Sequence, residues 1–224
     1  MCLIREAAEL VESITSSLGD PNVFRTAVAH LRRNDPKLRR VIDEQGIIKF
    51  APSGRMFESL VESIIVQQLA GAAANAIISI VKLLYSPQGV DPMSLYKTPT
   101  GKLRKAGVSP QKIRYLKDLS SRVVHGELEL ESLRESDEVL LEALDRVLGI
   151  GPWTVHMILI FTLGRPNVLP VDDLGVKKAV QQIYSLRKMP KKEKIQQLAE
   201  AWHPYCSVAA LYLWRHKDNQ QNRR

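Results

Sequence analysis

Apolar residues recur at helical intervals along nearly the whole chain, in short runs separated by glycine, proline, serine or aspartate. This spacing places the apolar side chains on one face of an α-helix, and the separating residues are those that start and stop helices. The pattern predicts helices over residues 3–18, 22–33, 36–45, 55–69, 72–84, 93–96, 100–106, 110–125, 128–133, 136–148, 152–163, 174–184, 191–202 and 207–215.

Alternating apolar and polar residues, the pattern of a half-buried strand, are nearly absent. The segment GIIKF at residues 46–50 is the one strand candidate, and its surroundings favour a loop. No segment repeats at a fixed period, which argues against a solenoid. We therefore expect a compact all-α fold, with the turn-forming segment YSPQGVDP at residues 85–92 as a boundary between two lobes.

Composition indicates a folded protein inside the cell. The chain has 224 residues, of which 45% are hydrophobic, yet no apolar run is long enough to span a bilayer. Its first residues, MCLIREAAELVESI, lack the apolar region of a signal peptide. Cys2 and Cys206 are the only cysteines, too few for a four-thiolate metal site, so we expect a reducing compartment and a place in the core for Cys206.

Positive charge is concentrated near the C-terminus. Of the 32 lysines and arginines 11 lie from Lys177 onward, against 3 of the 24 acidic residues, so this segment carries the whole net charge of +8. A basic region on an otherwise neutral chain favours a polyanionic partner. A solvated surface helix followed by a frayed tail explains the same charge, and charge alone leaves both interpretations open.

One segment combines two glycines with two adjacent carboxylates. LDRVLGIGPWTVHMIL, residues 144–159, predicts a helix, a Gly-Ile-Gly turn and a second helix that begins at Pro152. The turn amides and the following helix N-terminus together suit a phosphate, although an ordinary αα-hairpin has the same glycine turn. Asp172 and Asp173 precede the next predicted helix, which either of them can cap.

Several segments resemble those of a known enzyme family. LGIGPWT, followed by PVDD, is similar to the helix–hairpin–helix and Gly/Pro…Asp signature of DNA glycosylases, and more narrowly to that of the 3-methyladenine DNA glycosylase II branch. Three further segments resemble parts of the same family in the same order. The matching segments are residues 148–154 with 170–173, and residues 57–77, 103–120 and 202–214.

The resemblance runs from about residue 36 to residue 217 and implies one all-α, two-lobed glycosylase module with its active site between the lobes. One lobe would contain the hairpin over about residues 92–185. The other would combine about residues 1–91 with the C-terminal helices over 186–217, provided that these helices fold back.

The resemblance also implies a catalytic carboxylate. In this family the aspartate follows the second hairpin glycine by about 22 residues, and Asp173 stands 22 residues after Gly151. The family's alternative P-x-D spacing, counted from Pro170, selects Asp172 instead. We expect Asp173 to be the catalytic residue and Asp172 to cap the following helix.

The lysine that forms a Schiff base in bifunctional relatives stands two residues after the second hairpin glycine, where this chain has Trp153. We therefore expect a monofunctional enzyme that leaves the DNA backbone intact. The chain also lacks the iron–sulfur cysteines of other branches.

Electron-poor alkylated bases are attracted to aromatic faces, so the family positions Trp153 and Trp214 are expected to form the base pocket. Core packing is the alternative interpretation for both residues. Phe57, Tyr115 and Trp202 are weaker candidates, for which core packing is the favoured interpretation. Met157 occupies a pocket position that is often tyrosine in the family, and this departure affects the expected substrate range.

The remaining candidates concern DNA binding. The family's intercalation loop corresponds to Gln67, Gln68 and Leu69, which alternatively satisfy backbone groups between packed helices. Phosphate contacts are expected from two groups of residues, the hairpin amides and two nearby lysines. These residues are Gly149, Ile150, Gly151, Lys177 and Lys178.

Taken together, these features predict a monomeric, monofunctional glycosylase that flips alkylated purines, chiefly 3-methyladenine, out of double-stranded DNA and hydrolyses their N-glycosidic bonds. The alternatives are another damaged-base preference or a non-catalytic helix–hairpin–helix DNA-binding protein. We expect no metal site and no cofactor, apart from the monovalent cation that the family's hairpin often holds. The compartment would be the nucleus in a eukaryote and the cytoplasm in a prokaryote.

Overall fold

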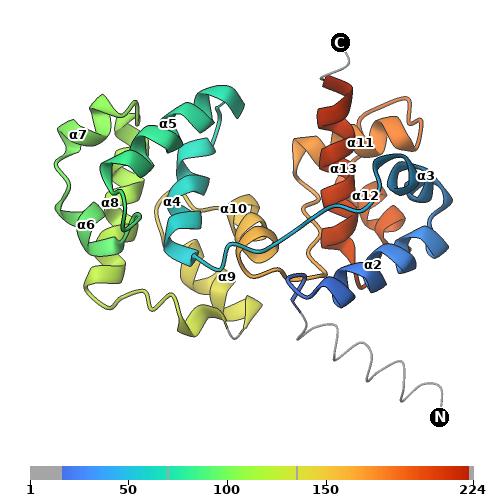
Figure 1. Ribbon diagram of the computed structural model, residues 1–224, viewed down its shortest axis with the longest axis horizontal. Coiled ribbons are helices and arrows are strands. Elements are labelled where there is room, and N and C mark those ends of the chain that lie inside the picture. The colour runs from blue at the N-terminus through green and yellow to red at the C-terminus, as the bar shows by residue number, and fades with distance from the viewer. Residues whose placement is uncertain (1–16, 70, 135, 222–224) are drawn as a thin grey trace. The chain divides into compact units, whose positions relative to one another are not determined.

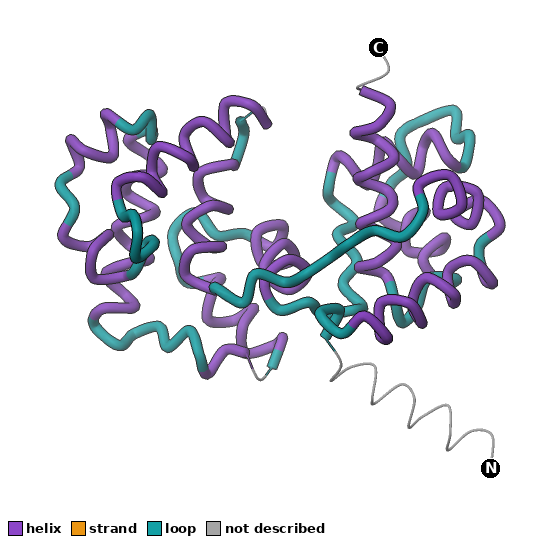
Figure 2. Tube along the Cα trace, in the orientation of Figure 1, coloured by secondary structure: helices purple, strands orange, loops and turns teal. Residues whose placement is uncertain are grey.

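The computed structural model describes residues 17–69, 71–134 and 136–221. All regular structure within these ranges is helical, and none of their residues forms a strand (Figure 2). The all-α prediction is confirmed, and GIIKF at residues 46–50 is a loop, as its surroundings indicated. The expected helix at residues 3–18 lies almost entirely outside the described residues.

Local sequence rules set most helix starts. Five helices begin with a proline, and in four of them an aspartate or serine directly before the proline accepts a backbone hydrogen bond from the first turn. Proline suits this position because the amide it lacks would have no partner within the helix. The four capping residues are Asp20, Asp35, Asp91 and Ser109.

The helices form two compact units. The first unit combines the described residues up to Pro52 with those from Leu159 onward, and the second is Ser53–Ile158. In Figure 1 the first unit holds the blue and the orange-to-red helices: α2 (Pro21–Asn34), α3 (Pro36–Gln45), α11 (Leu174–Ile183), α12 (Lys192–Ala199) and α13 (Cys206–Gln221).

Helix α13 is the centre of the first unit. All eight residues from Cys206 to Leu213 are buried, and the helix packs against α2, α3 and α11. A helix that is covered on every side belongs in a core rather than on a surface. The C-terminal helices therefore fold back onto the N-terminal ones, and the prediction that Cys206 is a core residue is confirmed.

A buried carboxylate ties this unit together. Asp35 is 6% exposed and accepts hydrogen bonds from the Trp202 indole Nε1 at 2.8 Å and from the Tyr184 hydroxyl. It also caps α3 through the amides of Lys37 and Leu38. Burial and the adjacent Asp35 carboxylate raise the pKa of Tyr184 well above its usual value.

The second unit surrounds α8 (Pro110–Val124), which packs against α4 (Met56–Val66), α6 (Pro92–Lys97) and α7 (Thr100–Lys105). The Lys117 Nζ atom on α8 donates to the carbonyls of Leu95, Tyr96 and Thr98 at the end of α6. A cation at this position satisfies the carbonyls that the helix end leaves unpaired. The unit also contains α5 (Gly71–Leu84), the 3₁₀ turn Ser132–Arg134, α9 (Asp137–Asp145) and α10 (Pro152–Met157).

The compact units differ from the predicted lobes, whose boundaries were expected near residues 92 and 185. The boundaries lie at Pro52 and Ile158 instead. The turn-rich segment 85–92 is a loop inside the second unit, where the Tyr85 hydroxyl donates to Thr98 at 3.0 Å. Turn residues mark a change of chain direction, which can occur within a unit as well as between units.

Three helix predictions are also corrected. Residues 128–133 form only a turn and part of a 3₁₀ turn, and the predicted helix 152–163 is α10 followed by a π-helical turn, Ile158–Thr162. Helix α13 extends to Gln221, beyond its predicted end at residue 215. Among the described residues, no helix combines the length and apolar character that crossing a membrane requires.

Candidate functional site

The predicted helix–turn–helix hairpin is present, and its turn requires a glycine at position 149. Gly149 has a φ of +78°, and a Cβ atom there would lie 2.1 Å from the Tyr115 ring of α8. Backbone strain and space therefore both exclude a side chain at this position. Gly151 is the N-cap of α10 and Pro152 its first residue, as predicted.

Part of the predicted phosphate site is used inside the protein. The Ile150 amide donates to the Val147 carbonyl at 3.2 Å, and the Ile150 side chain is buried. This amide therefore closes the turn, and its expected contact with phosphate stays a prediction. Asp118 on α8 accepts a hydrogen bond from the Leu148 amide at 2.9 Å and so holds the start of the hairpin.

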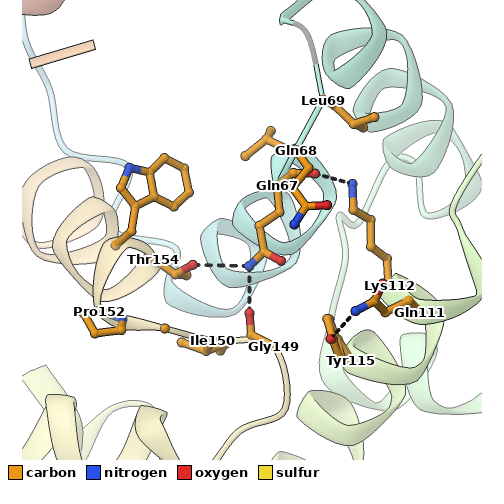
Figure 3. Close-up of a pocket in the computed structure, with 13 residues that line it drawn as sticks. Gln67, Gln68, Leu69, Gln111, Lys112, Tyr115, Gly149, Ile150, Pro152 and Thr154 are labelled. Atoms are coloured by element: carbon orange, nitrogen blue, oxygen red, sulfur yellow. Dashed lines mark hydrogen bonds between the residues drawn. The ribbon is translucent and has the colours of Figure 1, made fainter. Parts of the chain in front are cut away.

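A pocket of about 840 Å³ lies beside the hairpin, wholly within the second unit (Figure 3). It brings together all three hairpin residues, the three residues of the predicted intercalation loop and Trp153. Two α8 residues in its wall, Gln111 and Lys112, have no counterpart among the predicted site residues. The pocket is lined by Val66, Gln67, Gln68, Leu69, Gln111, Lys112, Tyr115, Gly149, Ile150, Gly151, Pro152, Trp153 and Thr154.

The predicted intercalation loop contains one anchored residue and two exposed ones. The Gln67 side-chain nitrogen donates to the Gly149 carbonyl at 2.7 Å and lies 3.4 Å from the Thr154 hydroxyl (Figure 3). Gln67 thus matches the alternative interpretation, in which it satisfies a backbone group. Gln68 is exposed at a φ of +58°, and Leu69 is 38% exposed, so both are accessible to a bound partner.

Lys112 holds the base of this loop, a role that periodicity did not reveal. Its Nζ atom donates to the carbonyls of Ile65 and Gln67 at 2.7 Å each, where α4 ends (Figure 3 shows the contact with Gln67). Burial lowers the pKa of this ammonium group. The exposed residues Gln68 and Leu69 therefore project from a firmly held backbone.

In the first unit, Asp173 is both the N-cap of α11 and the partner of Trp214. Its Oδ1 atom accepts from the Val176 amide and from the Trp214 indole Nε1, each at 2.8 Å. Donors of this kind fix the orientation of a carboxylate. The pairing of Asp173 with a predicted pocket aromatic was not evident from their separation of 41 residues in the chain.

The predicted role of Asp172 is wrong. Asp173 caps α11 itself, whereas the Asp172 side chain is 73% exposed and lies 3.2 Å from the Lys177 Nζ atom. The prediction assumes that one aspartate is catalytic and that the other caps α11. One residue can do both, because an N-cap uses one carboxylate oxygen and the same group can accept further hydrogen bonds. Lys177 is thus paired with Asp172, and Lys178 is exposed.

An aromatic residue absent from the predictions adjoins this pair. Phe161 stacks on Trp214 with ring centroids 5.4 Å apart, and 40% of its surface is exposed. Phe161 lies in the π-helical turn, and a π-turn shifts side chains out of helical register. Periodicity therefore gave no signal for this position.

Two predicted pocket residues lie elsewhere. Phe57 is 8% exposed and lines a separate cavity of about 640 Å³ in the second unit, apart from the hairpin pocket. Met157 is half-buried at the end of α10. In the part of the chain that the structure describes, His, Cys, Asp and Glu side chains form no group of three or more arranged to hold a metal ion.

Comparison with known proteins identifies the family. Residues 61–204 match the HhH-GPD superfamily of base excision DNA repair proteins. The chain therefore belongs to this superfamily, as the hairpin and the aspartate at α11 indicated.

Individual relatives narrow the similarity to one group of glycosylases within this superfamily. The chain is 32% identical to DNA-3-methyladenine glycosylase 1 of Schizosaccharomyces pombe over 95% of its own length and 91% of the relative's. The solved structure of the S. pombe 3-methyladenine DNA glycosylase Mag1 in complex with abasic DNA has a TM-score of 0.79, covering 85% of this chain and 95% of that chain. A DNA-3-methyladenine glycosidase structure from Bacillus halodurans is 32% identical, with a TM-score of 0.73 over 92% and 94% of the two chains.

Proposed function

We propose that this protein is a monofunctional DNA glycosylase that hydrolyses the N-glycosidic bond of alkylated purines in double-stranded DNA. Its substrates are 3-methyladenine and related N3- and N7-alkyl bases. The observation that carries the proposal is the Asp173 carboxylate at the start of α11, which accepts from the Val176 amide and from Trp214, an indole stacked on the part-exposed ring of Phe161. The similarity to DNA-3-methyladenine glycosylases supports this substrate class.

The first step is extrusion of the damaged nucleotide. Flipping costs a few kcal/mol, and a side chain must fill the vacated stack. Lys112 and Gln67 hold this loop in place, and its exposed residues are Gln68 and Leu69. We propose that these two side chains occupy the space that the flipped base leaves in the DNA stack. The hairpin around Gly149 and Gly151 grips the adjacent phosphate through backbone groups.

The second step is recognition of the base. N3- and N7-alkylated purines are cationic or electron-poor, and stacking them on an aromatic face contributes roughly 0.5–2 kcal/mol for each contact. Trp214 and Phe161 present such a face next to Asp173.

The third step is bond cleavage. As the base departs with the bonding electron pair, positive charge develops on the sugar, and the Asp173 carboxylate stabilises it. A water molecule then adds to the sugar carbon and loses its proton to the carboxylate, which leaves an abasic site. Trp153 stands where a lyase needs its lysine, so no Schiff base forms there and the backbone stays uncut.

The hairpin carbonyls also suit a monovalent cation. Gly149 and Val147 each use their carbonyl for one internal hydrogen bond, and a carbonyl oxygen has a second lone pair. A bound cation would add positive charge beside the phosphate. We expect tighter DNA binding in potassium than in a bulky organic cation at equal ionic strength.

Release of free base from methylated duplex DNA tests the proposal. The wild-type protein should release 3-methyladenine and leave the strand intact until alkali is added. A panel of duplexes with deaminated, oxidised and alkylated bases separates this activity from another base preference. Salt-dependent duplex binding without release of any base would identify a non-catalytic DNA-binding protein and overturn the proposal.

Chromosomal DNA as substrate implies a protein inside the cell, in the nucleus of a eukaryote or the cytoplasm of a prokaryote. The proposed steps draw every residue from one chain, and we propose that the protein acts as a monomer.

A further inference from the structure

Gly175 is the second residue of α11, where glycine has no conformational reason to occur. Its φ lies outside the positive range, so the backbone there is open to any residue. Glycine within a helix costs roughly 0.5–1 kcal/mol relative to alanine. The position therefore has some other requirement.

That requirement is space. A Cβ atom on Gly175 would lie 2.9 Å from the Asp173 Oδ1 atom, 2.9 Å from Trp214 Cδ1 and 3.2 Å from Trp214 Nε1. These are the atoms at and beside the hydrogen bond that joins Asp173 to Trp214. Carbon contacts below about 3.5 Å are repulsive, so something must move to admit a methyl group.

Neither neighbour can move without losing a contact. The Asp173 Oδ1 atom is also held by the Val176 amide at 2.8 Å, within the first turn of the same helix. The Trp214 ring stacks on Phe161, with its Nε1 atom directed at Asp173. A side chain at residue 175 would therefore separate the indole from the carboxylate.

We propose that Gly175 is a positioning residue for the Asp173 carboxylate: the missing side chain lets the Trp214 indole approach and fix that carboxylate's orientation. The inference rests on the proposed function, in which Asp173 stabilises the developing charge. A displaced carboxylate lowers the rate of bond cleavage while leaving the DNA-contacting residues of the second unit unchanged.

Gly175→Ala tests the proposal, and Gly101→Ala is its matched control. Gly101 is the second residue of α7, and a Cβ atom there would meet nothing within 4 Å. Single-turnover base release from methylated duplex should fall about a hundredfold in Gly175→Ala, as displacements of about 1 Å do. The DNA concentration at half-saturation should not change, and Gly101→Ala should match the wild type in both.

A double-mutant cycle separates positioning from general structural disturbance. Trp214→Phe keeps an aromatic ring but removes the Nε1 donor. If Gly175 acts through that donor, Gly175→Ala should cause little further loss in the Trp214→Phe background. Fully additive losses would overturn the proposal, as would a wild-type rate in Gly175→Ala or a parallel loss of DNA affinity.

Two further sets of variants separate misfolding and a wrong proposed function from a wrong positioning role. If Gly175→Ala fails to fold, Gly175→Ala with Trp214→Ala should fold, because the indole atoms that oppose the methyl group are gone and the Asp173 carboxylate, released from the indole, can turn away from it. Failure of both variants to fold overturns the proposal. Wild-type protein without base release, or Asp173→Asn at the full rate, refutes the proposed function itself. Release by the wild type, none by Asp173→Asn and the full rate in Gly175→Ala refutes the positioning role alone.

Discussion

The Gln67 side-chain amide donates a 2.7 Å hydrogen bond to the Gly149 carbonyl and so joins the loop after α4 to the glycine hairpin. The two residues are 82 positions apart in the chain. Their bond fixes the distance between the loop that carries Gln68 and the hairpin that grips phosphate in the proposed function. Its loss should affect both folding stability and catalysis.

We expect Gln67→Ala to lower the free energy of unfolding by about 1–2 kcal/mol, because the part-buried Gly149 carbonyl loses its donor. Base release should fall as well, since the loop and the hairpin no longer keep a fixed spacing. Urea denaturation and single-turnover release measure the two effects. Gln68→Ala is the control at the neighbouring exposed residue: it should reduce base release while leaving the urea midpoint unchanged. Equal stability losses in both variants would contradict the anchoring role of Gln67.

The two adjacent aspartates should behave differently. Asp173→Asn keeps a side chain able to cap α11 but removes the negative charge, so the protein should fold normally and lose roughly 10²–10⁴-fold in base release. Asp172→Asn is the matched control, because the Asp172 side chain is 73% exposed and its ion-pair partner is Lys177 on α11. A quantitative assay on methylated duplex distinguishes them. Comparable losses in both variants would show that the charge of the pair, rather than the Asp173 carboxylate, supports the reaction.

The sequence was informative where a residue's role depends on its near neighbours. The Gly149–Gly151 turn and the proline at the start of α10 follow from local backbone requirements. Periodicity also located nearly all the helices, because each one buries an apolar face.

The sequence was uninformative where a residue's role depends on packing between segments that are distant in the chain. Lys112 lies 45 residues from Gln67, and nothing in the local pattern of α8 marks it as the residue that caps α4. Phe161 was missed because a π-turn interrupts the helical register. The role of Asp172 was misassigned because spacing alone does not show which carboxylate turns toward the helix.

Alkaline pH should destabilise the first unit. Burial raises the pKa of the Cys206 thiol to about 12 from an ordinary value near 9, and burial with the Asp35 contact raises that of Tyr184. Groups whose folded pKa is raised hold their protons longer in the folded state, so their stabilisation is complete below the unfolded pKa and is lost as pH rises. The free energy of unfolding should fall between about pH 9 and 12, by up to about 1.4 kcal/mol per pH unit for each group.

Urea unfolding at several pH values measures this slope. Cys206→Ala removes one titrating group, so its slope should be shallower than that of the wild type between pH 9 and 10, where Cys206 titrates in the unfolded chain before tyrosine does. An unchanged slope in the variant would contradict the raised pKa of Cys206.

Asp35 should be among the residues to which stability is most sensitive. Asp35→Ala removes the cap of α3 and leaves the buried Trp202 indole and the Tyr184 hydroxyl without their acceptor. Buried donors without partners and a lost cap together cost about 3–5 kcal/mol. Thermal unfolding followed by circular dichroism measures the loss. Asp43→Ala is the control, because Asp43 forms a surface ion pair with Arg32, with about half of each side chain exposed, and such pairs contribute less than about 1 kcal/mol. If the two variants melted at the same temperature, the buried network around Asp35 would contribute no more than a surface ion pair, and the first unit would depend on apolar packing around α13 alone.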